Sequence, residues 1–240
     1  MRVPLPAPLA AVVFDVDGVL VESPHERAWR DALKDITDPA RFTTEIYQTH
    51  VAGKPRLSGA RAALEQLGLP YAGQHTLLYA ERKQRRLEEL IDAGEFTAFP
   101  DALRFVQAVG MLGLRLAAAS SSKNANAMMR LIRVDGSGQT LFDVFAANVC
   151  GRDLRQGKPH PEIFLHAAEE LGVNPAGCLV VEDAPVGIAA ARAGGMVALG
   201  VARLGDAASL RAAGAHLVVT SLDEVAVEAL TDGQLRTRSN

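Results

Sequence analysis

The sequence is poor in cysteine and carries no excess of basic charge. Cys150 and Cys178 are the only two cysteines in 240 residues, and they form no pattern typical of a disulfide framework or a zinc site. The formal net charge of −3 provides no basic surface of the kind that nucleic-acid-binding proteins carry. These absences exclude a disulfide-rich secreted scaffold and argue against nucleic acid as a partner.

A long uninterrupted apolar run is also missing. The apolar N-terminal segment is broken by Pro4, Pro6 and Pro8 and leads directly into Asp15, which fits neither a signal peptide nor a transmembrane helix. Two cysteines without a disulfide pattern are typical of a reducing compartment. The sequence therefore predicts a cytoplasmic protein with no membrane partner.

Lysine is scarce as well, since it supplies only five of the 25 lysine and arginine residues. A compact ammonium and a planar guanidinium are not interchangeable at a tight phosphate site. The few lysines are therefore candidates for anion binding, and they are Lys34, Lys54, Lys83, Lys123 and Lys158.

Hydrophobic periodicity predicts an α/β fold. Residues 10–14 form a short apolar run typical of a buried strand, and amphipathic helices are expected over 24–35, 40–50, 57–67 and 73–91. From residue 96 onward helices and strands alternate, with helices expected over 100–112, 123–133, 161–171, 185–193 and 207–213 and strands over 114–119, 144–148, 178–181, 196–201 and 217–220. Alternation of this kind predicts a doubly wound, Rossmann-like parallel sheet. We expect a core of residues 1–20 and 96–240, an all-α cap of residues 21–95, and a frayed polar tail over 231–240.

Asp15 and Asp17 are the most informative residues of the chain. They follow the first predicted strand, and side chains two apart on a strand point the same way. Open α/β sheets bind ligands at the carboxyl ends of their strands. Two negative charges there need a cation or a shared proton to offset their repulsion. This pair therefore indicates a metal site or a catalytic site.

Three other segments place polar residues at strand ends or on a tight loop. They are Ser120 to Asn124, the loop Gly157-Lys158-Pro159, and the acidic pair Glu182-Asp183. Taken singly, each has an ordinary explanation as a helix cap, a solvated lysine or a partner of a helix dipole. Their joint occurrence around one parallel sheet favours a shared chemical site.

In order and strand context, these four motifs resemble those of the haloacid-dehalogenase-like superfamily. The resemblance covers residues 14–183 and implies an enzyme that transfers phosphoryl groups. It implies that Asp15 is the nucleophile, that Asp17 carries the proton to and from the sugar oxygen, and that Ser120 and Lys158 hold the phosphoryl oxygens. The implied cofactor is Mg²⁺, and its ligands are Asp15, Asp17 through its backbone carbonyl, Glu182 and Asp183.

Within the superfamily, the sequence is most similar to the β-phosphoglucomutase-like subgroup. The likeness lies in the run Ser120 to Asn124 and in three cap motifs that begin at His25, Gly53 and Arg82. It implies a phosphosugar substrate bound by His25, Gly53, Arg56, Lys83, Ser121, Ser122, Lys123 and Asn124. The spacer before His25 is two residues shorter than in the subgroup, which leaves its position relative to Asp17 open.

Three functions remain open at this point. The first is a mutase that converts β-glucose 1-phosphate to glucose 6-phosphate, since a second anion site suits a substrate that carries two phosphates during turnover. The second is a sugar-phosphate phosphatase on the same scaffold. The third is an inactive sugar-phosphate-binding protein, although no nucleophile, acid or metal ligand is missing. We expect a monomer in each case.

Overall fold

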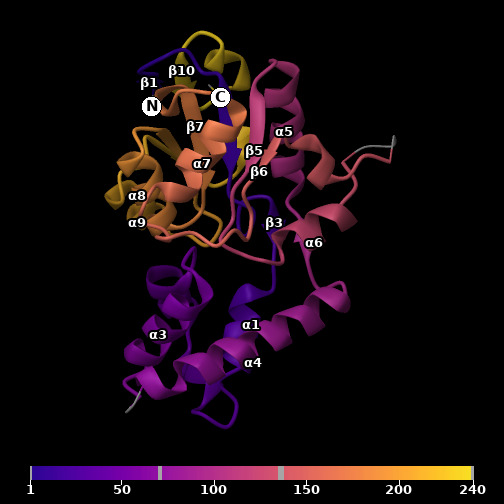
Figure 1. Ribbon diagram of the computed structural model, residues 1–240. Helices are drawn as coiled ribbons and strands as arrows, with labels where there is room; N and C mark the ends of the chain where they lie inside the picture. Colours follow the sequence, from indigo (N-terminus) through magenta and orange to yellow (C-terminus); the bar gives the residue numbers. More distant parts are fainter. Residues whose placement is uncertain (1, 70–71, 135–137, 239–240) are drawn as a thin grey trace.

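A six-stranded parallel sheet lies at the centre of the larger part of the molecule (Figure 1). The computed structural model describes residues 2–69, 72–134 and 138–238. The strand order is β6-β5-β2-β7-β8-β9, with β2 (Ala11–Phe14), β5 (Arg115–Ala118), β6 (Ala147–Asn148), β7 (Cys178–Glu182), β8 (Val197–Val201) and β9 (Leu217–Val219). From β2 the chain adds β5 and β6 on one side and β7, β8 and β9 on the other. The expected doubly wound core is confirmed.

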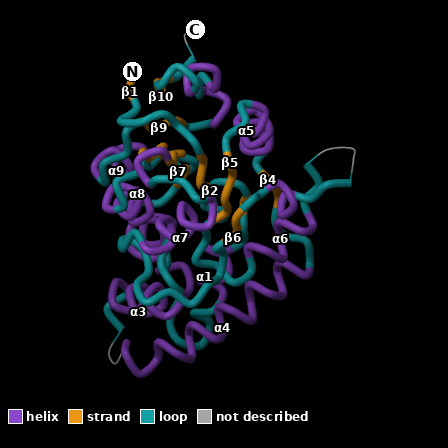
Figure 2. The backbone as a smooth tube through the Cα atoms, turned by 45° about the horizontal axis from the view of Figure 1, so that its top comes forward, coloured by secondary structure: helices purple, strands orange, loops and turns teal. Residues whose placement is uncertain are grey.

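Helices cover both faces of this sheet (Figure 2). Residues of one strand alternate between the faces, so Phe14 packs in the same apolar cluster as Phe105 of α5, and Val13 packs in the cluster that holds Ile188 of α8. All four residues of β2 are fully buried, as expected for a central parallel strand. The helices are α5 (Pro100–Met111), α6 (Ala125–Leu131), α7 (Glu162–Leu171), α8 (Pro185–Ala193) and α9 (Ala207–Ala212).

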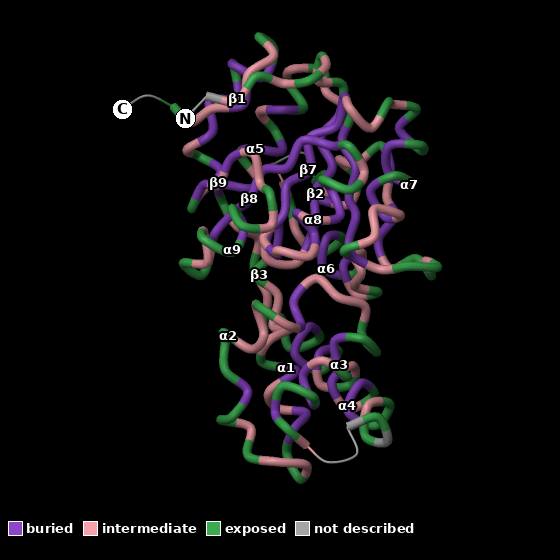
Figure 3. The backbone as a smooth tube through the Cα atoms, turned by 90° about the vertical axis from the view of Figure 1, so that its left-hand side faces the viewer, coloured by how far each residue is buried: buried purple, intermediate pink, exposed green. Residues whose placement is uncertain are grey.

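The helical insert lies between two very short antiparallel strands, β3 (Val21–Glu22) and β4 (Thr97–Ala98). It has its own apolar core, in which Trp29, Phe42 and Tyr79 are buried, and Figure 3 shows this second buried region below the sheet. Its helices are α1 (His25–Asp31), α2 (Thr44–Ile46), the π-helical turn η2 (Tyr47–Val51), α3 (Arg56–Gln66) and α4 (Ala72–Asp92).

The prediction of one helix over residues 40–50 is wrong. The chain forms a 3₁₀ turn at Pro39–Arg41, and Phe42 then takes an extended conformation with its side chain fully buried. Asp38 accepts a hydrogen bond from the backbone amide of Ala40, and Thr43 accepts one from Ile46, so each side chain begins a separate helical turn. Burial of an aromatic ring thus overrides the helical periodicity.

Other boundaries differ by less. The helix expected over 24–35 spans only His25–Asp31, and the strand expected over 144–148 is reduced to Ala147–Asn148 because Leu141–Val144 form a 3₁₀ turn. Further 3₁₀ turns are Pro175–Gly177, Leu222–Glu224 and Val227–Leu230.

The expectation of a frayed tail over 231–240 is wrong for residues 231–238, and residues 239–240 lie outside the described part of the chain. Strand β10 (Gln234–Arg236) pairs antiparallel with β1 (Arg2–Pro4), and the side chain of Leu235 is fully buried.

Among the described residues, no helix combines the length and the apolar character that crossing a bilayer requires.

Candidate active site

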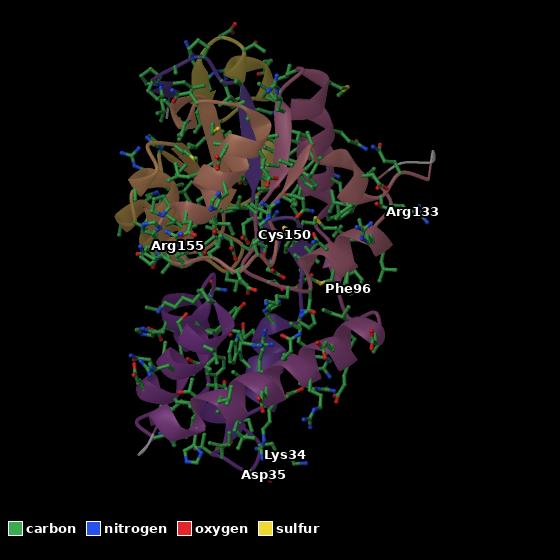
Figure 4. All side chains as sticks on the ribbon, in the orientation of Figure 1. Lys34, Asp35, Phe96, Arg133, Cys150 and Arg155 are labelled. Carbon is green, nitrogen blue, oxygen red and sulfur yellow. The ribbon has the colours of Figure 1, made fainter. Side chains whose placement is uncertain are left out.

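The carboxyl ends of β2, β5 and β7 bring the candidate catalytic residues together. In the parallel register Phe14 lies opposite both Ala118 and Val181, so these three strands end at the same edge of the sheet. Asp15 follows β2 and its amide donates to the Val181 carbonyl at 3.0 Å. Ser120 follows β5, and Glu182 is the last residue of β7. In Figure 4, Cys150 and Arg155 mark the side of the core that faces the insert.

Three carboxylates form a cluster at this edge, in which Asp15 and Glu182 are buried and Asp183 is partly exposed. One oxygen from each of Asp15, Glu182 and Asp183 lies within 4.8 Å of the other two. Lys158 places its ammonium 2.7 Å from Asp15 Oδ1 and also contacts Glu182. Burial, partly offset by Lys158, raises the pKa of Asp15 to about 8, and burial together with Glu182 raises the pKa of Asp183 well above its usual value. One ammonium therefore leaves the cluster short of positive charge.

Two glycines make room for these carboxylates. Gly18 has a φ of +84°, and a Cβ there would overlap the carboxylate of Asp183. A Cβ on Gly187 in α8 would overlap the carboxylate of Glu182. Glu182 itself is fully buried, with one oxygen near Lys158 and the other accepting from the Ala184 amide at 2.8 Å. The backbone is therefore shaped around the acidic side chains.

The Asp17 side chain turns away from the cluster. Ser120 Oγ donates to Asp17 Oδ2 at 2.9 Å, and His25 Nε2 lies 3.2 Å from Asp17 Oδ1. Although burial opposes it, His25 and the hydrogen bond from Ser120 hold the pKa of Asp17 well below its usual range. The shorter spacer before His25 therefore still lets the imidazole reach Asp17.

His25 links Asp17 to Lys83 of α4. The ammonium of Lys83 lies 3.0 Å from His25 Nδ1 and 4.9 Å from the centre of the Trp29 ring. An ammonium can only donate, so Nδ1 accepts and the His25 proton sits on Nε2, facing Asp17. Burial lowers the pKa of Lys83 to about 7. Burial also lowers the pKa of His25, and the positive charge of Lys83 lowers it further.

The serine-rich loop after β5 lies beside the insert. Ser120 Oγ accepts from the Ser122 amide at 3.0 Å, and Ser122 Oγ accepts from the Asn124 amide at 3.2 Å. Ser121 Oγ donates to the Gly53 carbonyl at 3.4 Å, which joins this loop to the cap. The Lys123 side chain is exposed and lies 2.8 Å from Asp153.

Core and insert together line one cavity of about 360 Å³. It brings together most residues that the sequence singles out: Asp15, Asp17, His25, Gly53, Arg56, Lys83, Ser120, Ser121, Ser122, Lys123 and Asp183. Three others are not among its lining residues. Lys158 and Glu182 are buried and in contact with the Asp15 cluster, and Asn124 Oδ1 accepts from Gln84 at 3.3 Å.

Several lining residues were not predicted. Tyr47 begins the π-helical turn η2, a rare conformation that often occurs at functional sites. Gln84 lies next to Lys83 on α4, and Asp153 approaches from the loop before α7. The sequence offers no signal for Asp153, because its place in the cavity lining depends on how its loop packs against the distant loop that carries Lys123.

The acidic cluster has the donors that a hard divalent cation needs. Carboxylate oxygens are hard ligands, and the three carboxylates of this cluster are paired with a single ammonium, that of Lys158. Asp15 and Asp183 are the better placed pair, because both oxygens of Glu182 already have partners. The residues therefore fit a metal ion.

Comparisons with known proteins show which family this chain resembles over most of its length. Residues 9–195 match the family of haloacid dehalogenase-like hydrolases. The β-phosphoglucomutase of Mycobacterium bovis is 35% identical, over 92% of this chain and 93% of its own. The phosphorylated carbohydrates phosphatase of Thermotoga maritima is 32% identical, over 88% of this chain and 94% of its own. The crystal structure of an archaeal β-phosphoglucomutase from Pyrococcus has a TM-score of 0.73 and 32% identity, covering 94% of this chain and 100% of that chain.

Proposed function

Because this chain belongs to the family of haloacid dehalogenase-like hydrolases, we propose that it transfers a phosphoryl group on a phosphorylated sugar through an aspartyl-phosphate at Asp15. The specific reaction proposed is the conversion of β-glucose 1-phosphate to glucose 6-phosphate. This proposal rests on one observation. A single cavity is lined by Asp15, the proposed nucleophile, and also by further anion-binding side chains from the core and the cap. The M. bovis and Pyrococcus relatives, both named β-phosphoglucomutases, support the choice of substrate.

Two sets of donors, in the cavity and next to it, support a mutase. Lys158 lies 2.7 Å from Asp15 Oδ1, and Ser120 donates to Asp17 at 2.9 Å, so both suit the phosphoryl group that is transferred. Arg56, Lys123 and Ser122 also line the cavity, and they form the second set, which suits the phosphate that does not react. A mutase passes through a sugar bisphosphate, so it needs both sets at once.

The proposed chemistry begins with Asp15. An Asp15 oxygen attacks phosphorus, the bond from phosphorus to the sugar oxygen breaks, and the leaving oxygen takes a proton from Asp17. In the second half-reaction Asp17 removes the proton from the incoming hydroxyl, which attacks the aspartyl-phosphate and frees Asp15. Asp15, Asp183 and the Asp17 carbonyl, with Glu182 beside them, would hold a Mg²⁺ ion, which would supply positive charge to offset that of the phosphoryl oxygens.

Asp17 needs two protonation states for these roles. In this structure His25 and Ser120 hold it ionised, which is the form that accepts a proton. A phosphate dianion bound beside it adds negative charge and raises its pKa toward the protonated form. The cap, proposed as residues 21–95, supplies His25 and excludes water from the intermediate when closed.

The test is to incubate the protein with β-glucose 1-phosphate, Mg²⁺ and a catalytic amount of glucose 1,6-bisphosphate. We expect glucose 6-phosphate with negligible free phosphate, and loss of turnover when a chelator removes the metal. Rapid release of phosphate at the expense of isomerised product would overturn the mutase. It would instead support a sugar-phosphate phosphatase, the activity named for the T. maritima relative.

Lys83 predicts a pH dependence of substrate binding. With its pKa lowered to about 7 by burial, Lys83 loses its positive charge as the pH rises through that value, and attraction of the sugar phosphate weakens. We expect the KM for β-glucose 1-phosphate to rise above pH 7. The free energy of unfolding should also increase with pH between about 7 and the ordinary 10.5, because in this range the unfolded chain binds the proton that buried Lys83 has lost.

The variant Lys83→Arg keeps its charge throughout this range and should remove the rise in KM. Lys34→Arg is the matched control, since Lys34 is exposed at the end of the cap far from the core (Figure 4) and should keep the wild-type profile. An unchanged profile in Lys83→Arg would show that another group titrates.

A further inference from the structure

Within the described residues, two segments cross between core and cap, and both contact one arginine. Strands β3 and β4 pair through Val21 with Ala98 and through Glu22 with Thr97. At the core end of this hinge, the Phe99 amide donates to the Leu20 carbonyl at 3.0 Å. Figure 1 shows β3 between the sheet and the cap helices.

Arg203, in the loop after β8, contacts both crossings. Its Nη2 donates to the Val19 carbonyl at 3.3 Å on the outgoing segment, and its guanidinium carbon lies 4.0 Å from the centre of the Phe99 ring on the returning segment. One planar group thus combines a hydrogen bond to one segment with a cation–π contact to the other.

A buried carboxylate fixes the orientation of this guanidinium. Arg203 Nη1 donates to Asp101 Oδ2 at 2.7 Å, and the same oxygen accepts from Ser221 Oγ at 2.8 Å and from the Leu222 amide at 2.7 Å. The side chains of Asp101 and Arg203 are only 8% and 14% exposed, so the pair is shielded from solvent. Arg203 is therefore held by a rigid part of the core.

The Val19 carbonyl belongs to the turn that carries Asp17. In this turn the Gly18 amide donates to the Val21 carbonyl at 2.8 Å, and the Val21 amide donates to the Val16 carbonyl at 2.9 Å. A displacement of Val19 therefore reaches both Asp17 and the first residue of β3.

We propose that Arg203 is a positioning residue that fixes the core end of both hinge segments and so maintains the closed cap and the placement of Asp17. Its effect on catalysis rests on the proposed function, whereas its effect on the hinge does not. Loss of these contacts loosens β3 and β4, and phosphosugars that need the closed cap are turned over more slowly. A small phosphate ester that reaches Asp15 without cap contacts is affected much less.

The test compares Arg203→Lys and the double variant Asp101→Asn/Arg203→Met, which leaves no buried charge unpaired, with Arg104→Met as the control. Arg104 pairs with Asp223 on the surface of α5 and touches neither hinge segment. Amide hydrogen exchange in residues 16–24 and 96–100, measured without substrate, should accelerate about tenfold in the Arg203 variants only. The kcat/KM for β-glucose 1-phosphate should fall about tenfold, while that for p-nitrophenyl phosphate stays close to wild type.

Unchanged exchange in the hinge overturns the proposal, whatever the activity. An equal fall on both substrates also overturns it, because it reduces Arg203 to a general stabilising residue. If neither substrate is turned over by the wild type, the proposed function fails, but the exchange measurement still decides whether Arg203 holds the hinge.

Discussion

Replacing Asp15 with asparagine is expected to abolish turnover of every phosphate ester while leaving the protein folded. The amide cannot attack phosphorus, and loss of a nucleophile of this kind lowers kcat by about 10⁴-fold or more. Stability should be maintained or increased, because Asp15 is a buried acid beside Glu182 and Asp183, and Lys158 keeps an oxygen acceptor in the amide. The measurements are kcat with a phosphosugar and the melting temperature.

The matched control is Asp232→Asn, which makes the same change at an exposed position and should leave kcat unaltered. Incubation with a phosphoryl donor should label Asp232→Asn but not Asp15→Asn with an acid-stable, base-labile acyl phosphate. A fully active Asp15→Asn protein, or a label that persists in it, would mean that phosphorus is attacked by another group.

The variant Asp17→Ala is expected to lose about 10²–10⁴-fold in kcat on a phosphosugar, the usual range for a general acid–base residue. Its contacts with Ser120 and His25 are polar and local, so the fold should persist. An ester with a good leaving group separates the two roles of Asp17. With 2,4-dinitrophenyl phosphate the first step needs no proton, so one equivalent of dinitrophenolate should appear in a burst before turnover stalls at the aspartyl-phosphate.

The control for this experiment is Asp232→Ala, which makes the same change at an exposed position outside the cavity lining. It should turn over without the stall. If Asp17→Ala shows neither a burst nor a loss of kcat, Asp17 does not carry the proton. If it shows no burst and a loss as deep as Asp15→Asn, Asp17 acts in forming the acyl phosphate even with a good leaving group.

The general position of the site could be predicted because it follows from one property of parallel sheets. Asp15, Ser120 and Glu182 are far apart in the sequence, yet each follows or ends an apolar run that reads as a buried strand. Once these runs pair in parallel, their ends must meet at one edge. The sequence around each of these residues is therefore enough to predict which edge of the sheet carries the site.

Features that depend on contacts between distant loops could not be predicted. The break at Phe42 arises because its ring is needed in the core of the cap, which competes with helical periodicity. The hinge strands β3 and β4 have two residues each, which is too short to show the alternation of apolar and polar residues that predicts a strand. Neither the pairing of Lys123 with Asp153 nor the reach of Arg203 to Val19 has a signal in the neighbouring residues.

The pairing of β1 with β10 has a practical consequence for handling the protein. It holds residues 2–4 and 234–236 together at the end of the core opposite the cap (Figure 1). An affinity tag or a fusion partner at either terminus is therefore remote from the mouth of the substrate cavity. The adjacent ends also suit circular permutation, with a short linker joining them and new termini opened in an exposed loop.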